Sequence, residues 1–66
     1  MKNTVKEERQ KKQLTQTQLA ELVGVSRQTI FSIEINKYVP SVMLSLKLAK
    51  AFGKKVEEIF KLESTD

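Results

Sequence analysis

Residues 15–35 read TQTQLAELVGVSRQTIFSIEI, and this stretch contains signals for two helix starts with a helix stop between them. Thr15 and Gln18 have the spacing of a capping box, so a helix is expected to begin directly after Thr15. Gly24 suits the left-handed residue that ends many helices, and Ser26 is a favoured residue for capping a following helix. The stretch therefore predicts two short helices joined by a very short turn.

Both predicted helices have an apolar face. Helical periodicity places Leu19, Leu22 and Val23 on the inner face of the first, and Ile30 and Ile33 on that of the second, which runs from Arg27 to about Ile35. A turn this short that contains glycine is typical of a helix-turn-helix, here about residues 15–35, whose second helix enters the major groove of DNA. An ordinary corner between two helices is the alternative interpretation.

The outer face of the second helix has the side-chain types that hydrogen-bond to base edges. Arginine pairs with guanine, glutamine pairs with adenine, and serine or threonine suit several bases. Proteins with this motif contact bases through the N-terminal residues of that helix. The candidate base-reading residues are Ser26, Arg27, Gln28, Thr29 and Ser32. A solvated polar face that binds nothing is the alternative interpretation.

The flanking sequence predicts three more helices, which makes the chain all-α with five helices. Thr4 and Glu7 have capping-box spacing and begin a polar first helix. Ser41 is the expected cap of the fourth helix, which Gly53 ends. These three helices are expected over residues 5 to about 13, 42–52 and about 56–60; residues 1–3 and 61–64 are too short to assign and are open to short β segments, and residues 63–66 form a polar tail.

The fourth predicted helix is unusually apolar. One stripe consists of Leu44, Leu48, Ala51 and Phe52, a second of Val42, Leu46 and Ala49, and Ser45, Lys47 and Lys50 are expected to face solvent. The first stripe is expected to fill the core. The second either packs on the last helix within the same core or faces a second subunit.

The composition excludes several classes of function. The 66 residues include no cysteine and no histidine, so neither a disulfide framework nor a zinc site is expected, and the usual catalytic bases and nucleophiles are missing. No stretch has the length of a membrane span, and no signal peptide is present. We expect one small cytoplasmic domain without enzymatic activity, metal, cofactor or small-molecule ligand. Its net charge of +4 favours nucleic acid as the partner.

The residues from Leu14 to Ile30 strongly resemble the Cro/CI (Xre) family of helix-turn-helix regulators. The similarity continues through residues 33–34, 37–38 and 40–41 and the closing stretch 57–60, so that it covers about residues 4–60. The resemblance implies a five-helix, lambda-repressor-like fold in a single domain over residues 1–66. It also implies a homodimer that binds a palindromic operator in double-stranded DNA and controls transcription.

The resemblance also implies roles for individual residues. It implies base contacts by the five candidates on the second helix of the motif, and a phosphate contact by Gln16, whose place at a helix N-terminus suits an anion. It implies contacts to the DNA backbone by Asn36, Lys37 and Tyr38, and a partly buried ion pair between Arg9 and Glu34. Two unrelated surface charges are the alternative for that pair.

Several residues depart from the family pattern. Glu8 stands where an apolar residue is usual, which leaves the first helix little to bury and questions its docking. Gln13 and Asn36 occupy turn positions where glycine is commoner, so slight backbone strain is expected. Phe31 and Ile35 replace polar residues; they either contact thymine methyl groups or a partner protein, or are ordinary exposed apolar side chains.

The sequence favours a DNA-binding regulator, most simply a repressor, and leaves two other classes open. One is an antitoxin-type interaction module that binds a toxin partner and represses its own operon. The other is a binder of DNA or membrane surfaces without sequence preference, for which residues 27 and 28 would matter little.

Overall fold

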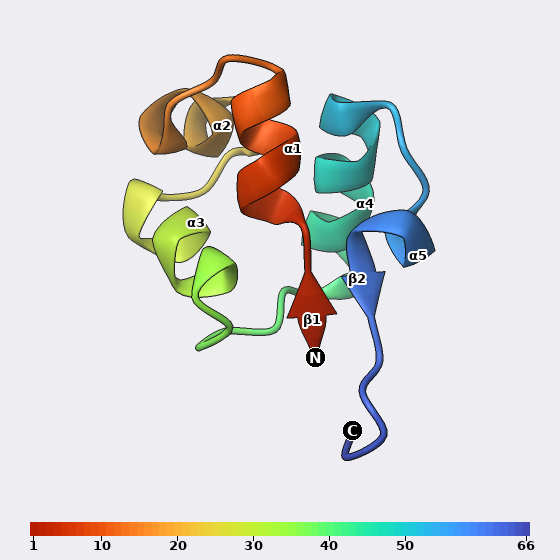
Figure 1. Cartoon of the computed structure of the whole chain (residues 1–66). Coiled ribbons are helices and arrows are strands. Elements are labelled where there is room, and N and C mark those ends of the chain that lie inside the picture. Colours follow the sequence, from red (N-terminus) through yellow and green to blue (C-terminus); the bar gives the residue numbers. More distant parts are fainter.

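The computed structural model describes residues 1–66 and contains five helices and a two-stranded antiparallel sheet (Figure 1). None of the helices is long and apolar enough to cross a membrane. The elements in chain order are β1 (Lys2–Asn3), α1 (Val5–Lys11), α2 (Gln16–Val23), α3 (Arg27–Glu34), α4 (Val42–Phe52), α5 (Val56–Ile59) and β2 (Phe60–Lys61). The predicted five-helix fold is therefore confirmed, and β1 and β2 form at the two termini.

The motif of α2, turn and α3 forms through the local signals of the sequence. Thr15 Oγ1 accepts a hydrogen bond from Gln18 N at 3.0 Å, and Thr15 N donates to Gln18 Oε1 at 2.9 Å, which completes a capping box. Gly24 ends α2 with φ of 74°. Ser26 Oγ accepts from Thr29 N at 3.2 Å and so caps α3. Asn36 follows α3 with φ of 62°, in the left-handed region expected at this turn.

The start of α1 differs from the prediction. Thr4 makes no side-chain cap, and its Oγ1 is buried without a hydrogen-bond partner. Asn3 replaces it, since Asn3 Oδ1 accepts from Val5 N at 3.0 Å, while Thr4 N donates to Ile59 O at 2.9 Å. The pairing of β1 with β2 holds Asn3 and Thr4 in this arrangement. At its other end α1 stops at Lys11, before Gln13 turns the chain with φ of 57°.

The C-terminal helix is shorter than predicted. It ends at Ile59, because Phe60 takes extended backbone and pairs with Asn3 in the sheet. Phe60 nevertheless remains in the core at 8% exposure. The chain ends therefore lie side by side, and a short tail follows β2 (Figure 1).

All five helices and β2 contribute to the core. Its twelve buried apolar residues are Val5, Leu19, Ala20, Val23, Ile30, Ile33, Leu44, Leu48, Ala49, Phe52, Ile59 and Phe60. Leu22 was predicted on the inner face of α2 but is 64% exposed, and Ala20 is buried instead. A small side chain fits there because α2 packs closely on both α3 and α4.

The second apolar stripe predicted on α4 is divided. Ala49 is buried in the core, whereas Val42 and Leu46 are 77% and 56% exposed. Ser45, predicted to face solvent, is buried at 9% exposure, because the loop before α4 and the chain termini cover that side of the helix. The structure therefore leaves apolar side chains of α4 on the surface.

The doubt about the docking of α1 was wrong. Val5 is fully buried, and Glu8 is buried at 6% exposure. Glu8 Oε2 lies 3.1 Å from Lys54 Nζ and 3.7 Å from Lys11 Nζ. Glu8 thus occupies a position where an apolar residue is usual, and lysine side chains pair with its buried carboxylate. The helix α1 packs on α3 and α4.

The N-terminal amine forms ion pairs with two carboxylates of the C-terminal tail. It lies 3.1 Å from Asp66 Oδ2 and 3.4 Å from Glu63 Oε1. The hydrogen bond to Asp66 raises the pKa of the Met1 amine above its ordinary 8.0. The backbone N–H of Glu63, at 2.8 Å from Asp66 Oδ2, and then the amine lower the pKa of Asp66 below its ordinary 3.8.

Candidate nucleic-acid interface

The N-terminal half of α3 presents its polar side chains together with one residue of the following loop. Four of the predicted base-reading residues and one predicted backbone contact line a shallow surface depression of about 260 Å³: Ser26, Gln28, Thr29, Ser32 and Tyr38. Arg27, also on the first turn of α3, is exposed but does not line this depression. The motif thus gathers these residues on one outer surface of the molecule.

These polar side chains are not equally free. The hydroxyl groups of Ser26 and Thr29 lie 3.0 Å apart and hydrogen-bond to each other, and the Ser26 hydroxyl also caps the helix. Arg27 and Gln28 are exposed, and neither side chain has an intramolecular hydrogen bond or ion pair. Arg27 and Gln28 are therefore the side chains whose full hydrogen-bonding capacity is open to a ligand.

The loop after α3 folds back onto that helix. Lys37 N and Tyr38 N both donate to Ser32 O, at 2.9 and 3.2 Å. Asn3 Nδ2 donates to Asn36 Oδ1 at 2.9 Å and to Ile33 O at 3.0 Å, which ties the loop to β1. The exposed ammonium group of Lys37 has no ion pair and so adds a free positive charge beside α3.

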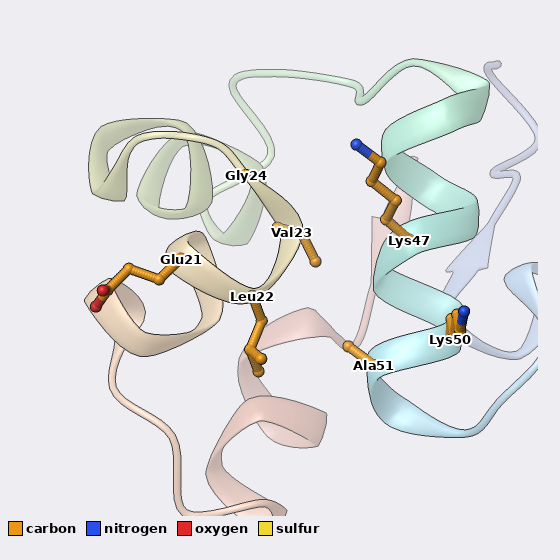
Figure 2. A pocket seen from close by; sticks show the side chains of 7 residues that line it. All are labelled: Glu21, Leu22, Val23, Gly24, Lys47, Lys50 and Ala51. Atoms are coloured by element: carbon orange, nitrogen blue, oxygen red, sulfur yellow. The ribbon is translucent and has the colours of Figure 1, made fainter.

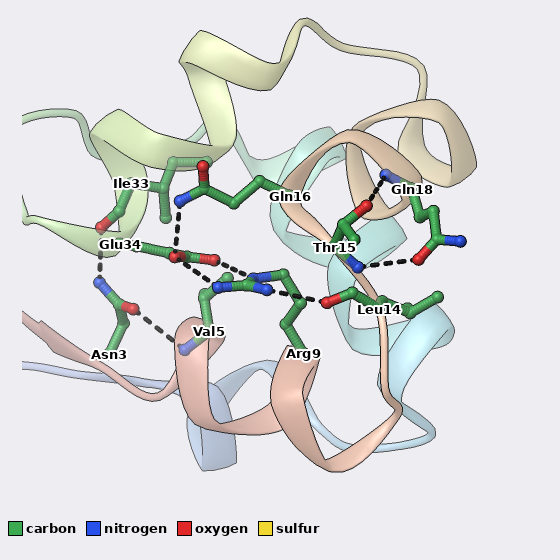
Figure 3. A network of polar contacts seen from close by, with 9 residues as sticks. All are labelled: Asn3, Val5, Arg9, Leu14, Thr15, Gln16, Gln18, Ile33 and Glu34. Atoms are coloured by element: carbon green, nitrogen blue, oxygen red, sulfur yellow. Dashed lines mark hydrogen bonds and ion pairs between the residues drawn. The ribbon is translucent and has the colours of Figure 1, made fainter.

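A polar network joins α1, α2 and α3 beneath this surface (Figure 3). Arg9 Nε donates to Glu34 Oε2 at 2.7 Å, and Arg9 Nη2 donates to Glu34 Oε1 at 3.3 Å. Gln16 Nε2 donates to Glu34 Oε1 at 3.1 Å, and Arg9 Nη1 donates to Leu14 O at 2.8 Å. The side chains of Arg9 and Glu34 are only 11% and 3% exposed.

The two apolar departures on α3 lie one turn apart. Phe31 is 39% exposed and Ile35, which directly follows the helix, is 43% exposed. Residues at this spacing are neighbours on one helix face, so the two side chains form a small apolar area next to the polar one.

The largest surface hollow lies elsewhere, between α2 and α4 (Figure 2). Its volume is about 600 Å³, and it contains none of the predicted DNA-contacting residues. The hollow is lined by Glu21, Leu22, Val23, Gly24, Lys47, Lys50 and Ala51. Exposed Leu22 and two lysines without ion pairs are its main chemical features.

Sequence reasoning missed Asn3 as part of this site. The residue holds both the end of α3 and the loop that follows it, through hydrogen bonds to residues 30 and 33 positions away in the sequence. Nothing in a two-residue strand predicts such a partner. The hydrogen bond from Gln16 to Glu34 is likewise not predicted by the sequence, because only the packing of α2 on α3 brings these two residues together.

Comparisons with known proteins agree with this architecture. The model of the helix-turn-helix family matches residues 5–59. The HTH-type transcriptional regulator YgzD of Bacillus subtilis is 52% identical over 63 residues, which are 96% of each chain. An HTH-type transcriptional regulator of Methanocaldococcus jannaschii is 52% identical over the whole of both chains, and one of Methanothermobacter thermautotrophicus is 44% identical over 96% of this chain and 93% of its own. The chain belongs to the helix-turn-helix family, in agreement with its resemblance to the Cro/CI regulators.

Proposed function

We propose that the protein is a sequence-specific transcriptional repressor that binds a palindromic operator in double-stranded DNA as a homodimer in the cytoplasm. The observation that carries the proposal is the exposed start of α3, where Arg27 and Gln28 have no internal partner. Arginine and glutamine read guanine and adenine in the major groove. The regulators that share about half of the sequence are helix-turn-helix transcriptional regulators by name.

Each residue at the interface has a role in this proposal. Arg27 and Gln28 read bases, with Ser26, Thr29 and Ser32 as shorter polar contacts around them. Gln16, Asn36, Lys37 and Tyr38 contact the DNA backbone on either side, which sets the orientation of α3 without reading sequence. Phe31 and Ile35 provide an apolar surface that suits thymine methyl groups.

An exposed apolar surface supports the homodimer. Val39, Val42, Met43 and Leu46 are 64%, 77%, 68% and 56% exposed, and we call them the α4 apolar surface. Three of these residues, Val39, Val42 and Leu46, line a groove of about 210 Å³ together with Met1, Pro40 and Phe60. Exposed apolar patches of this kind mark interaction sites, and a two-fold axis through such a patch places it against the same patch of a second copy.

The position of that surface also suits paired recognition. It follows directly in the chain after the loop that ends α3, and a dimer with both copies of α3 on one side would insert them into successive major grooves. Half-sites about 10 base pairs apart are therefore expected.

The test is selection of bound duplexes from a random DNA pool with the full chain. The expected result is one palindromic sequence with half-sites about 10 base pairs apart, centre to centre. Recovery of unrelated sequences with equal affinity would contradict sequence-specific binding and favour a non-specific binder.

The antitoxin alternative has the same α4 apolar surface in its favour, because that surface also fits a different protein. Expression of the tagged protein from its native operon separates the two. Purification as a homodimer agrees with the repressor proposal, whereas a stable stoichiometric complex with a second small protein, and loss of toxicity of that protein, favours the antitoxin.

A further inference from the structure

We propose that Glu34, with its charge offset by Arg9, is a positioning residue that orients the carboxamide of Gln16 for contact with a DNA phosphate. The proposal rests on the function proposed above. It assigns the buried network a role in binding, in addition to joining α1 to α3.

The chemistry of the contact determines which end of the carboxamide faces inward. An ionised carboxylate only accepts hydrogen bonds, so the Gln16 nitrogen, not its oxygen, must face Glu34. The contact is 3.1 Å long, and the Glu34 side chain is 3% exposed, so water does not readily replace either group. One N–H of the nitrogen is used, and its second N–H stays available to an acceptor such as a phosphate oxygen.

The restriction of Gln16 favours binding. A free glutamine side chain has several rotatable bonds, and ordering them on a ligand opposes binding. Glu34 orders the side chain before DNA arrives, at the first residue of α2, where free backbone N–H groups also favour an anion.

Arg9 makes this arrangement compatible with DNA. A carboxylate without a partner beside the start of α2 would repel an approaching phosphate. Arg9 contacts both oxygens of Glu34, at 2.7 and 3.3 Å, and offsets its charge. Arg9 also donates to Leu14 O at 2.8 Å, just before α2, so the same guanidinium holds the start of α2 near the end of α3. The phosphate contact is thereby kept at a set distance from the base-reading residues.

The experiment is a mutant cycle on operator affinity and on urea stability. The variants are Gln16→Ala, the pair Arg9→Met with Glu34→Leu, and all three together. The paired apolar variant removes the anchor without stranding a charge and loses only the hydrogen bond from Arg9 to Leu14 O in addition, so its urea midpoint is expected to fall much less than that of either single variant. Its affinity for the selected operator is expected to fall about tenfold, as for Gln16→Ala, and the triple variant is expected to bind no more weakly than Gln16→Ala.

The matched control is the other ion pair with a buried carboxylate, Glu8→Leu with Lys54→Met, which makes no hydrogen bond to Gln16 or Glu34. Any affinity change it causes is expected to add to that of Gln16→Ala. Wild-type affinity in the Arg9→Met, Glu34→Leu variant would overturn the proposal. A loss in that variant that adds fully to the loss from Gln16→Ala would overturn it as well.

A second measurement needs neither DNA nor a drastic substitution. In the wild type, the side-chain amide of Gln16 is expected to exchange with solvent several-fold more slowly than that of exposed Gln10, by nuclear magnetic resonance. Glu34→Gln replaces one of the two accepting oxygens by an N–H donor and removes the negative charge that Gln16 faces, so the Gln16 amide resonances are expected to shift and lose part of this protection. Equal exchange of Gln16 and Gln10 would overturn the positioning role. If the selection yields no specific DNA, the function proposed above fails, and the exchange measurement still decides whether Glu34 holds Gln16.

Discussion

Glu8 Oε2 lies 3.1 Å from Lys54 Nζ, and this contact joins the middle of α1 to the turn that follows α4. The Glu8 side chain is 8% exposed and that of Lys54 is 36% exposed, so the pair extends from the interior to the solvent. Because the ammonium group stays partly hydrated, the carboxylate bears most of the desolvation cost. The pair therefore holds α1 in place with a residue that is costly to bury.

This arrangement predicts opposite effects for two substitutions of Glu8. Glu8→Ala is expected to lower the free energy of unfolding by about 1–3 kcal/mol, because it loses the ion pair and leaves a cavity. The Glu8→Leu protein is expected to have a free energy of unfolding equal to or higher than that of the wild type, since an apolar side chain needs no partner and Lys54 can turn to solvent. Urea denaturation measures both free energies of unfolding. The control is Glu7→Ala at an exposed residue, which is expected to stay within about 0.5 kcal/mol of the wild type. A Glu8→Leu protein as unstable as Glu8→Ala would show that the ion pair itself is required.

Gln28→Ala is expected to weaken operator binding by about 1–3 kcal/mol and to leave affinity for random duplexes nearly unchanged, because Gln28 is assigned to base recognition. Fluorescence anisotropy with both DNAs at one salt concentration measures the difference. Gln10→Ala, an exposed glutamine of α1, is the control. Equal weakening on operator and random DNA would mean that another face of α3 reads the bases.

Lys37→Ala is expected to weaken binding to operator and random DNA alike, because the free ammonium beside α3 is assigned to a phosphate. The slope of log K against log salt is expected to fall in magnitude by about one unit. A salt titration of both DNAs measures this slope, and Lys6→Ala, at an exposed lysine of α1, makes the same charge change elsewhere. An unchanged slope for Lys37→Ala would remove Lys37 from the interface.

Leu46→Lys is expected to convert the proposed homodimer into a monomer that stays folded, because it places a charge in the α4 apolar surface without touching the core. Sedimentation at tens of micromolar protein measures the mass. Leu62→Lys is the matched control, since Leu62 is 81% exposed in the tail after β2. A wild-type protein that sediments as a monomer and binds DNA with one copy per duplex would contradict the proposed dimer.

The clamp between the Met1 amine and Asp66 predicts a pH window. The raised pKa of the amine means that its contribution is present below pH 8.0 and is lost as pH rises through the raised value. The lowered pKa of Asp66 means that its contribution is present above pH 3.8 and is lost as pH falls through the lowered value. The tail is therefore expected to be held between about pH 4 and 8. Titration by nuclear magnetic resonance checks this: Asp66→Asn should return the amine pKa toward 8.0, and Thr65→Ala should not.

The helix starts and stops of the motif could be predicted because they depend on neighbours in the chain. The caps at Thr15, Ser26 and Ser41 each pair a side chain with a backbone N–H three residues later, and Gly24 and Asn36 adopt positive φ where such residues tolerate it. Local spacing contains all the information that these features need. The same is true of the exposed polar start of α3.

The burial of individual side chains and their hydrogen-bond partners could not be predicted from local spacing in the sequence. Leu22 and Ser45 were placed on the wrong sides, because helical periodicity does not tell which neighbours cover a face. Asn3, not Thr4, accepts the hydrogen bond from Val5 N at the start of α1, because β2, from the far end of the chain, pairs with β1 and holds this segment.

The sequence by itself therefore determined the five helices, the short turn and the set of polar residues exposed at the start of α3, since local hydrogen bonds and periodicity are sufficient for these. Only the tertiary structure decided that Glu8 meets Lys54 and that Glu34 holds Gln16. These contacts form between residues 46 and 18 positions apart, and a buried charge is tolerated only where packing brings a partner to it.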